Sequence, residues 1–417
     1  MLLRARIVYP VTTPPIEDGG VIVAHGRIVA LGRHRDLSEG FSGERVDLGD
    51  SILLPGLVNA HCHLDYTNLA RQIAPPGSFT DWVKQLITLK AGWSYTDYAE
   101  SWLEGSHQLL DCGTTTVGDI EAVPELLADV LPATPLRVTS FREIITIRSS
   151  RSAPRMLDEA LADLAHVPAG RHRPGLSPHA PYSTTQELAR LTREACRSRG
   201  WRWTMHVGES TEERDMLQEG RGPMYDWLRP QRPMEDCGGL SPVGWLERAG
   251  ALGPELLVAH ANHVSEPEAS LLASTGVQVV HCPRSHDYFG HTRFPHGLLQ
   301  RAGVSVCLGT DSLVSVRSPR GTKPVLSLFA EMESFARSHP GVPASDIVAM
   351  ATVKGGAALG FGLESVGVIA PGAHADLISI PLPEGTREPA EAIVHHPGPV
   401  ASSLIEGNWV IRPPRHG

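Results

Sequence analysis

Two histidines placed two positions apart are the first residues of this chain whose types and spacing could do chemistry. The sequence AHCHLD contains His61 and His63 directly after the apolar run LLPGLVN. Side chains of a β-strand alternate between its two faces, so both imidazoles would lie on the same face. Two neutral imidazoles at the end of a strand supply half of the ligands of a metal site. A pair of packed or surface histidines explains an isolated motif of this kind equally well, so the rest of the chain must decide.

Two more residues could complete such a metal site. His206 ends the β-rich segment WTMH, and Asp311 follows the segment VSVCLGT. Together with His61 and His63 they would provide three imidazoles and one carboxylate, a ligand set that suits Zn²⁺, with Fe²⁺ or Mn²⁺ as alternatives. A catalytic metal keeps one position for water and lowers the pKa of that water towards ~7. The sequence therefore predicts a site for one divalent metal.

Further polar residues near these positions have the chemistry of catalytic groups. Glu209 comes three residues after His206, where a loop can fold back over the metal, and it is placed for general acid–base proton transfer. The alternative for Glu209 is an acidic residue at the start of a helix, which is a favourable position in itself. His260 could hold the attacking water or polarise the reacting carbon, and Asp311 could accept a proton from the water. His179 is expected to contact substrate, because the ligand set is already complete.

The elements that must position these residues alternate in type between residues 55 and 364. Short apolar segments predict strands, and helix-like stretches lie between them. The predicted strands are 57–63, 114–119, 136–141, 175–179, 203–206, 256–260, 277–281 and 304–310. The predicted helices include 97–111, 156–166, 185–199, 266–275 and 325–338. This alternation is typical of an α/β fold of the (β/α)₈ TIM-barrel type, in which active sites lie at the carboxyl ends of the strands.

The two ends of the chain are predicted to form a second, smaller domain. Residues 1–54 and 365–417 are rich in short β segments separated by tight turns that contain Gly or Asp. We expect the two ends to pair into one discontinuous β-sandwich domain, with the metal-dependent barrel domain of residues 55–364 inserted between them. The alternative is that the two ends do not pair with each other and form two independent additions to the barrel.

Bulk composition narrows the class of protein. The chain of 417 residues is 41% hydrophobic and 20% charged, as expected for a globular protein, and its formal net charge of −9 argues against partners such as nucleic acid or an anionic membrane. No apolar stretch approaches the ~20 residues of a membrane span, and the first residues are too polar for a signal peptide. Six cysteines are scattered without a CxxC motif, which favours a reducing cytoplasm over a disulfide framework.

Motifs along nearly the whole chain resemble those of the amidohydrolase superfamily, in particular its deaminase and chlorohydrolase branch. They are PGLVNAHCHLD, SPHAPYS, HVGES, VAHANHVSE, VVHCPRSH, LGTDSL and PGAHADLISI. The resemblance implies a barrel with a discontinuous β-sandwich, and it assigns one metal to His61, His63, His206 and Asp311. It also implies catalytic roles for Glu209 and His260 in the hydrolytic deamination of an aromatic amine. Glu209 would pass a proton to the ring nitrogen and then to the leaving ammonia, while Asp311 takes the remaining proton.

Two segments narrow the expected substrate. CPRSHDYFGH and FTDWVKQL resemble aminodeoxyfutalosine deaminases, which convert 6-amino-6-deoxyfutalosine to futalosine and ammonia on a route to menaquinone. Residues 71–95 lack the glutamate that relatives of the adenosylhomocysteine type use near the ribose, which weakens that assignment. The alternatives are a deaminase of another purine nucleoside (5′-methylthioadenosine/S-adenosylhomocysteine type) or a heteroaromatic-ring hydrolase. An alternative of another class is a metal-free binding or scaffold protein on the same fold.

Several residues are candidates for contacts with this small-molecule substrate. Its carboxylate calls for a planar guanidinium, and Arg148 and Arg284 follow predicted strands at the active side of the barrel. Ser285 and His286 stand where many relatives have Ser-Asn, and Trp82 could line a pocket for a ring. Solvated surface arginines and a packed Trp are the alternatives. Barrels of this type often pair through their outer helices, so a homodimer is possible.

Overall fold

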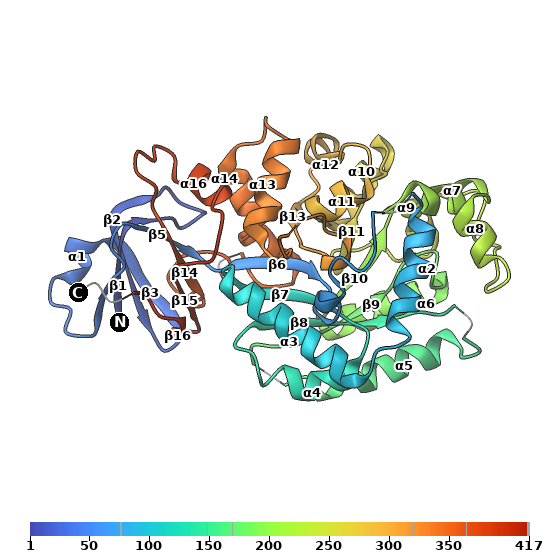
Figure 1. Cartoon of the computed structure of the whole chain (residues 1–417), viewed down its shortest axis with the longest axis horizontal. Coiled ribbons are helices and arrows are strands. Elements are labelled where there is room, and N and C mark those ends of the chain that lie inside the picture. Colours follow the sequence, from blue (N-terminus) through green and yellow to red (C-terminus); the bar gives the residue numbers. More distant parts are fainter. Residues whose placement is uncertain (76, 148, 169, 319–320, 364, 415–417) are drawn as a thin grey trace.

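The computed structural model contains two β-sheets, a curved sheet surrounded by helices and a second sheet beside it (Figure 1). It describes residues 1–75, 77–147, 149–168, 170–318, 321–363 and 365–414. Strands from both ends of the chain, blue and red in Figure 1, lie together in the second sheet. The long middle of the chain builds the first.

The first sheet is parallel throughout and forms a barrel, as predicted. Its spatial order follows the sequence from β6 to β13. The strands are β6 (Leu57–Cys62), β7 (Thr114–Glu121), β8 (Arg137–Ile144), β9 (Arg173–Pro178), β10 (Arg202–Val207), β11 (Leu256–His260), β12 (Gln278–His281) and β13 (Val306–Leu308). The barrel closes where Cys62 bridges to Asp311 and where the N–H groups of Thr310 and Asp311 donate to the carbonyl of His61. This closure places the end of β6 beside the end of β13.

Helices surround the barrel (Figure 1). They are α2 (Phe79–Lys90), α3 (Tyr95–Asp111), α4 (Leu127–Val130), α5 (Ala153–Asp163), α6 (Gln186–Arg199), α7 (Thr211–Glu219), α8 (Pro223–Leu228), α9 (Pro242–Arg248), α10 (Glu266–Thr275), α11 (Pro283–Phe289), α12 (His296–Ala302), α13 (Leu328–Ser338), α14 (Ala344–Met350), α15 (Val353–Ala358) and α16 (Pro389–Val394). Short 3₁₀ turns are η1 (Leu64–Leu69), η2 (Pro124–Leu126), η3 (Leu164–His166) and η4 (Leu313–Ser315). Within the described ranges, none of the helices has both the length and the apolar character that a membrane crossing needs.

Two apolar clusters separate the inner and outer faces of the barrel strands. Trp203 and Met205 of β10 are buried in the large cluster that includes the surrounding helices. Val58 of β6 and Leu257 of β11 belong to a separate cluster inside the barrel. Because strand side chains alternate, His206 points to the opposite face from Met205, into the barrel.

The second sheet joins the two ends of the chain. Its strands are β1 (Leu2–Val8), β2 (Ile16–Ala24), β3 (Arg27–Arg33), β4 (Arg45–Asp47), β5 (Ser51–Pro55), β14 (Leu377–Pro381), β15 (Ser402–Ile405) and β16 (Asn408–Ile411), with the short helix α1 (His34–Ser38) after β3. The order is β16-β15-β14-β5-β1-β2-β3, and β4 pairs with β1. The two ends meet where β14 runs antiparallel to β5, with Ile380 opposite Ile52. The domain boundaries 1–54 and 365–417 stay a prediction.

A buried ion pair links the barrel to the second sheet. Arg137 begins β8, and its guanidinium lies 3.1 Å from the Asp376 carboxylate, just before β14. Both side chains are 2% exposed. The same guanidinium reaches Glu406 at 3.2 Å. A charge pair that water does not screen therefore joins the second sheet to the barrel, beside the apolar contacts of β5 and β14.

Candidate active site

Six buried titratable side chains converge at the carboxyl ends of the barrel strands. They are His61, His63, His206, Glu209, His260 and Asp311. The Nε2 atoms of His63 and His206 are 3.3 Å apart. Asp311 Oδ1 lies 3.8 Å from Nε2 of His61 and 3.6 Å from Nε2 of His63. Ligands about 2.1 Å from a zinc ion can be at most about 4.2 Å from one another, so these atoms are close enough to share one ion.

The backbone at the strand ends is unusually tight. Gly309 approaches β6 so closely that a Cβ there would lie 2.8 Å from the carbonyl oxygen of His61, which only glycine avoids. Asp311 has a φ of 53°, and His260 and Ala261 have φ values of 75° and 50°. Left-handed conformations of non-glycine residues cost about 1–3 kcal/mol and concentrate at functional sites. The backbone is therefore strained at the residues that bring the side chains of His260 and Asp311 to the cluster.

The protonation of the histidines suits a metal cation. Burial lowers the pKa of His61 to about 3 and that of His63 well below its ordinary value, so both rings are neutral at neutral pH. His206 donates its Nδ1 proton to the His179 carbonyl at 2.9 Å, and its Nε2 faces Nε2 of His63. Both ring nitrogens of His61 are buried without a hydrogen-bond partner. A divalent metal among these buried ring nitrogens would give the nitrogens of His61 the partner that they lack, so these residues fit the predicted ion.

Glu209 is held at the junction between β10 and α7. Gly208 turns the chain with a φ of 63°, and Ser210 caps the helix by accepting a hydrogen bond from the N–H of Glu213 at 3.1 Å. The Glu213 carboxylate accepts hydrogen bonds from the N–H groups of Gly208 at 3.1 Å and Glu209 at 2.8 Å. This arrangement leaves the Glu209 carboxylate 3.7 Å from His260 Nε2. Glu213 was not predicted from the sequence, although Ser-x-x-Glu at 210–213 is a helix-capping signature.

The environment of Glu209 prepares it for proton transfer. Burial raises its pKa well above the ordinary value, and the neighbouring carboxyls of Asp311 and Glu213 raise it further. A carboxyl group with a raised pKa can both give and take a proton near neutral pH. The placement of Glu209 at the pocket is therefore compatible with general acid–base chemistry.

Two serines orient Asp311. Ser285 donates a hydrogen bond to Oδ2 of Asp311 at 2.6 Å, and Ser315 does so at 3.2 Å. The other oxygen, Oδ1, is left to face His61 and His63. The structure thus places the hydroxyl of Ser285 on a metal-site carboxylate, and the substrate contact predicted for Ser285 stays a prediction. Ser315 was not predicted, because no local pattern connects it to Asp311.

The cluster opens into a pocket whose walls are mostly apolar. The apolar lining includes Trp82, Val83, Leu86, Ile87, Ile145, Ile147 and Trp227. His179 and Trp82, both predicted to contact substrate, are among the lining residues. The enclosed space is about 150 Å³, and Ile87 and Ile145 are 54% and 45% exposed. An apolar pocket with a few convergent polar groups is the usual form of a small-molecule site, and a longer ligand would extend towards these exposed side chains.

Other predicted contact residues lie elsewhere or cannot be placed. Arg284 pairs with the buried Glu331 at 2.6 Å and does not line the pocket. The ring nitrogens of His286 contact the Asn262 side chain at 3.1 Å and the Thr292 carbonyl at 2.8 Å. Arg148 lies outside the described residues. The substrate contacts predicted for these three residues stay predictions.

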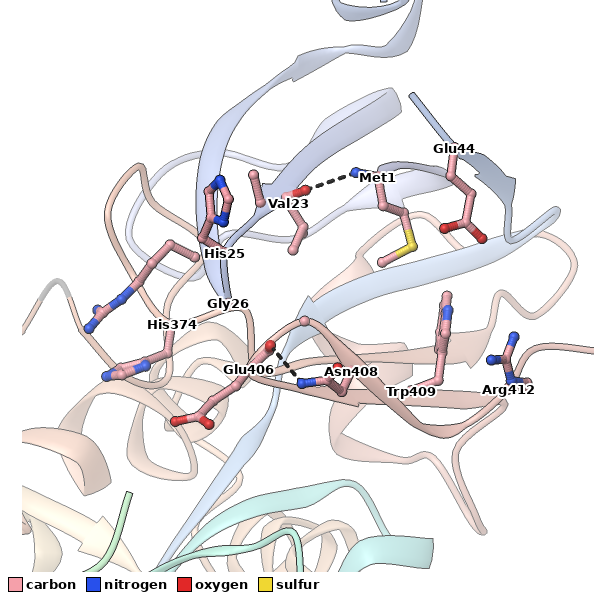
Figure 2. Close-up of a pocket in the computed structure, with 13 residues that line it drawn as sticks. Met1, Val23, His25, Gly26, Glu44, His374, Glu406, Asn408, Trp409 and Arg412 are labelled. Atoms are coloured by element: carbon pink, nitrogen blue, oxygen red, sulfur yellow. Dashed lines mark hydrogen bonds between the residues drawn. The ribbon is translucent and has the colours of Figure 1, made fainter. Parts of the chain in front are cut away.

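A larger hollow of about 890 Å³ lies in the second sheet (Figure 2). Figure 2 shows Met1, Glu406 and Asn408 on its wall. These groups already have protein partners, since Glu406 pairs with Arg137 at 3.2 Å and the Met1 amino group donates to the Val23 carbonyl at 2.9 Å. Every grouping of metal-ligating side chains found in the described part of the chain lies at the barrel instead. The barrel cluster is therefore the candidate active site.

Comparisons with known proteins agree with this geometry. Residues 52–410 match the model of the Amidohydrolase family. A 5-methylthioadenosine/S-adenosylhomocysteine deaminase of Nitratidesulfovibrio vulgaris is 30% identical over 387 residues, covering 90% of this chain and 82% of that protein. An aminodeoxyfutalosine deaminase of Deinococcus radiodurans is 28% identical over 371 residues, covering 85% of this chain and 84% of that protein. A crystal structure of an adenosine deaminase from Xanthomonas campestris with bound zinc has a TM-score of 0.85 at 25% identity, covering 98% of this chain and 92% of that one.

Proposed function

The chain belongs to the Amidohydrolase family of metal-dependent hydrolases, and on this premise we propose that it is a hydrolytic deaminase of an adenine-type nucleoside. It is an enzyme that acts on carbon–nitrogen bonds in cyclic amidines. The observation that carries the proposal is the position of Glu209, His260 and Asp311. Their ligand atoms lie within 4.8 Å of one another beside the imidazoles, and Glu209 and Asp311 face the pocket.

The residues divide the chemistry among them. A divalent metal held by His61, His63, His206 and Asp311 would supply a Lewis acid that lowers the pKa of water. Glu209 takes one proton from the water and gives it to the ring nitrogen as the water adds to the amino-bearing carbon. Asp311 takes the remaining proton of the water, and Glu209 passes this proton on to the amino group as ammonia leaves, so that both carboxyl groups return to their starting state. His260, whose buried Nε2 has no hydrogen-bond partner, donates a hydrogen bond to the oxygen at the tetrahedral carbon.

The finer proposal is that 6-amino-6-deoxyfutalosine is the substrate, converted to futalosine and ammonia in menaquinone biosynthesis. The motifs CPRSHDYFGH and FTDWVKQL and the likeness to the Deinococcus protein support it. The likeness to the Nitratidesulfovibrio protein favours a second candidate, a deaminase of 5′-methylthioadenosine or S-adenosylhomocysteine. Zinc is the proposed metal.

Ammonia release from a panel of adenine nucleosides tests both levels of the proposal. We expect aminodeoxyfutalosine to give a kcat/KM at least about 10-fold above 5′-methylthioadenosine, S-adenosylhomocysteine and adenosine, because a matched pocket discriminates by this order. Removal of metal with a chelator should abolish turnover, and Zn²⁺ should restore it. Turnover of the other nucleosides alone would overturn the finer proposal. No ammonia from any adenine nucleoside would overturn the function, and metal-free purified protein would favour a scaffold.

A change at Ser285 tests how Asp311 is oriented. Ser285→Ala removes the hydrogen bond to Oδ2, and we expect kcat or metal affinity to fall about 10- to 100-fold, as is typical when the outer partners of metal ligands are removed. Steady-state kinetics and zinc titration measure the two effects. Ser198→Ala, an exposed serine on α6, should change neither. Equal kinetics and zinc affinity in both variants would contradict the orienting role.

A further inference from the structure

Two opposite charges stand in the apolar pocket without pairing with each other. Lys90, the last residue of α2, and Glu143, near the end of β8, both line it. The Lys90 ammonium contacts Tyr66, through the hydroxyl and over the ring at 4.1 Å from its centre, and its charge also acts on the buried Asp65 carboxylate without forming an ion pair with it. The Glu143 side chain has His179 Nε2 at 3.9 Å as its nearest ionic partner, which is beyond hydrogen-bond distance. Neither residue was singled out from the sequence.

The Glu143 carboxylate has hydrogen-bond acceptor sites that no described residue fills. Glu143 is 8% exposed, and no described donor makes a hydrogen bond to its carboxylate. Its oxygens are not among the fully buried atoms without a partner, so they open into the pocket and its water. A carboxylate that leaves water must exchange its hydrogen bonds to water for new ones. A ligand in the pocket that brings hydroxyl donors would replace them.

The apolar side chains of α2 form a surface in the pocket that ends at Lys90. Val83, Leu86, Ile87 and Lys90 recur at helical spacing and line the same pocket. Ile87 is 54% exposed although it is a large apolar residue, and Ile145 across the pocket is 45% exposed. An arm that covers these side chains would end close to the ammonium of Lys90.

We propose that Lys90 and Glu143 form one substrate subsite, in which Glu143 accepts hydrogen bonds from the sugar hydroxyls and Lys90 binds an anion at the end of an apolar 5′ arm. The subsite rests on the proposed nucleoside deaminase function and narrows its substrate class to acid-bearing, 5′-extended ribonucleosides. Both residues are specificity-determining contacts that take no part in the proton transfers.

The anion contact is tested with a matched pair of substrates, a 5′-thioadenosine with a carboxypropyl arm and its neutral carboxamide. Wild-type enzyme should prefer the acid by about 10- to 100-fold in kcat/KM, the scale of a charge-assisted hydrogen bond. Lys90→Met should remove that preference through KM, and Lys90→Arg should keep it. Lys84→Met, on the same helix, should behave as wild type. An equal loss on acid and amide in Lys90→Met would assign a structural role to Lys90 and overturn the proposal.

The sugar contact is tested with adenosine and 2′-deoxyadenosine. Wild-type enzyme should prefer the ribonucleoside by about 10-fold or more, and Glu143→Gln should reduce that ratio by about 10-fold, since a charged acceptor strengthens the bond. An unchanged ratio in Glu143→Gln would overturn the role of Glu143.

The subsite and the proposed function fail in different ways. Ammonia release with no acid preference in wild type contradicts the subsite alone. No ammonia release from any adenine nucleoside contradicts the function, and calorimetric titration of the acid and the amide then tests the subsite without turnover. Tighter binding of the acid that Lys90→Met removes would still support the anion contact, and equal binding would overturn it.

Discussion

The Glu209→Gln variant is expected to lose about 10²- to 10⁴-fold in kcat while it keeps its metal and its fold, because only proton transfer is removed. The glutamine amide preserves the size of the side chain but cannot exchange a proton with a ring nitrogen or an amine. The proposed ligands are other residues, so zinc content should stay at the wild-type value. KM should change little, because the loss falls on the transition state.

The rate of ammonia release measures the expected loss of kcat, and the zinc content per chain measures whether the metal is retained. Glu219→Gln is the matched control, since Glu219 is an exposed carboxylate at the end of the same helix, α7. It should retain wild-type kinetics. A Glu209→Gln variant that turns over normally would refute the acid–base role, and one that loses its zinc would make Glu209 a ligand.

Arg137→Met is expected to lower the free energy of unfolding by about 3–5 kcal/mol, because it leaves the Asp376 carboxylate buried without its cation. Asp376 is 2% exposed and cannot regain water without opening the contact between the barrel and the second sheet. It keeps one hydrogen bond, from the N–H of Glu406 at 2.8 Å. This single bond does not replace the charge of the guanidinium.

Equilibrium urea denaturation of the zinc-loaded protein measures this loss. Arg190→Met is the control, because Arg190 is an exposed arginine that pairs with Glu194 on α6 at 2.7 Å. Exposed pairs of this kind contribute about 0–1 kcal/mol. If both variants unfold at the same urea concentration, the buried pair does not hold the two parts of the molecule together.

Much of the barrel could be predicted because its strands are short apolar segments with turn residues on both sides. Each predicted strand overlaps one strand of the parallel sheet, and the segment 256–260 coincides with β11. The helix α2 was not among the predicted helices, although Ser78 caps it and Trp82 lines the pocket from it. The apolar side chains of α2 line the pocket, and the pocket is formed by segments that are far apart in the sequence.

The residue types at the strand ends determined the chemistry in advance. Imidazoles and carboxylates after parallel strands must meet at one end of a barrel, since all strands of such a sheet point the same way. His61, His63, His206 and Asp311 could therefore be placed at one end of the barrel from their positions in the chain, and the structure has them in one buried cluster. Their role as the ligands of one metal stays a prediction.

The tertiary structure alone decided the contacts that no spacing encodes. Strand alternation would put the side chain of His260 on the outer face of the barrel, together with that of Val258. The backbone of His260 has a φ of 75° instead, and its imidazole lies in the cluster. The hydrogen bond from Ser285 to Asp311 and the position of Lys90 in the lining of the pocket are two such contacts. Side-chain partners from distant segments form only when the chain closes on itself, because a hydrogen bond or a desolvated charge depends on position in space and not on distance along the chain.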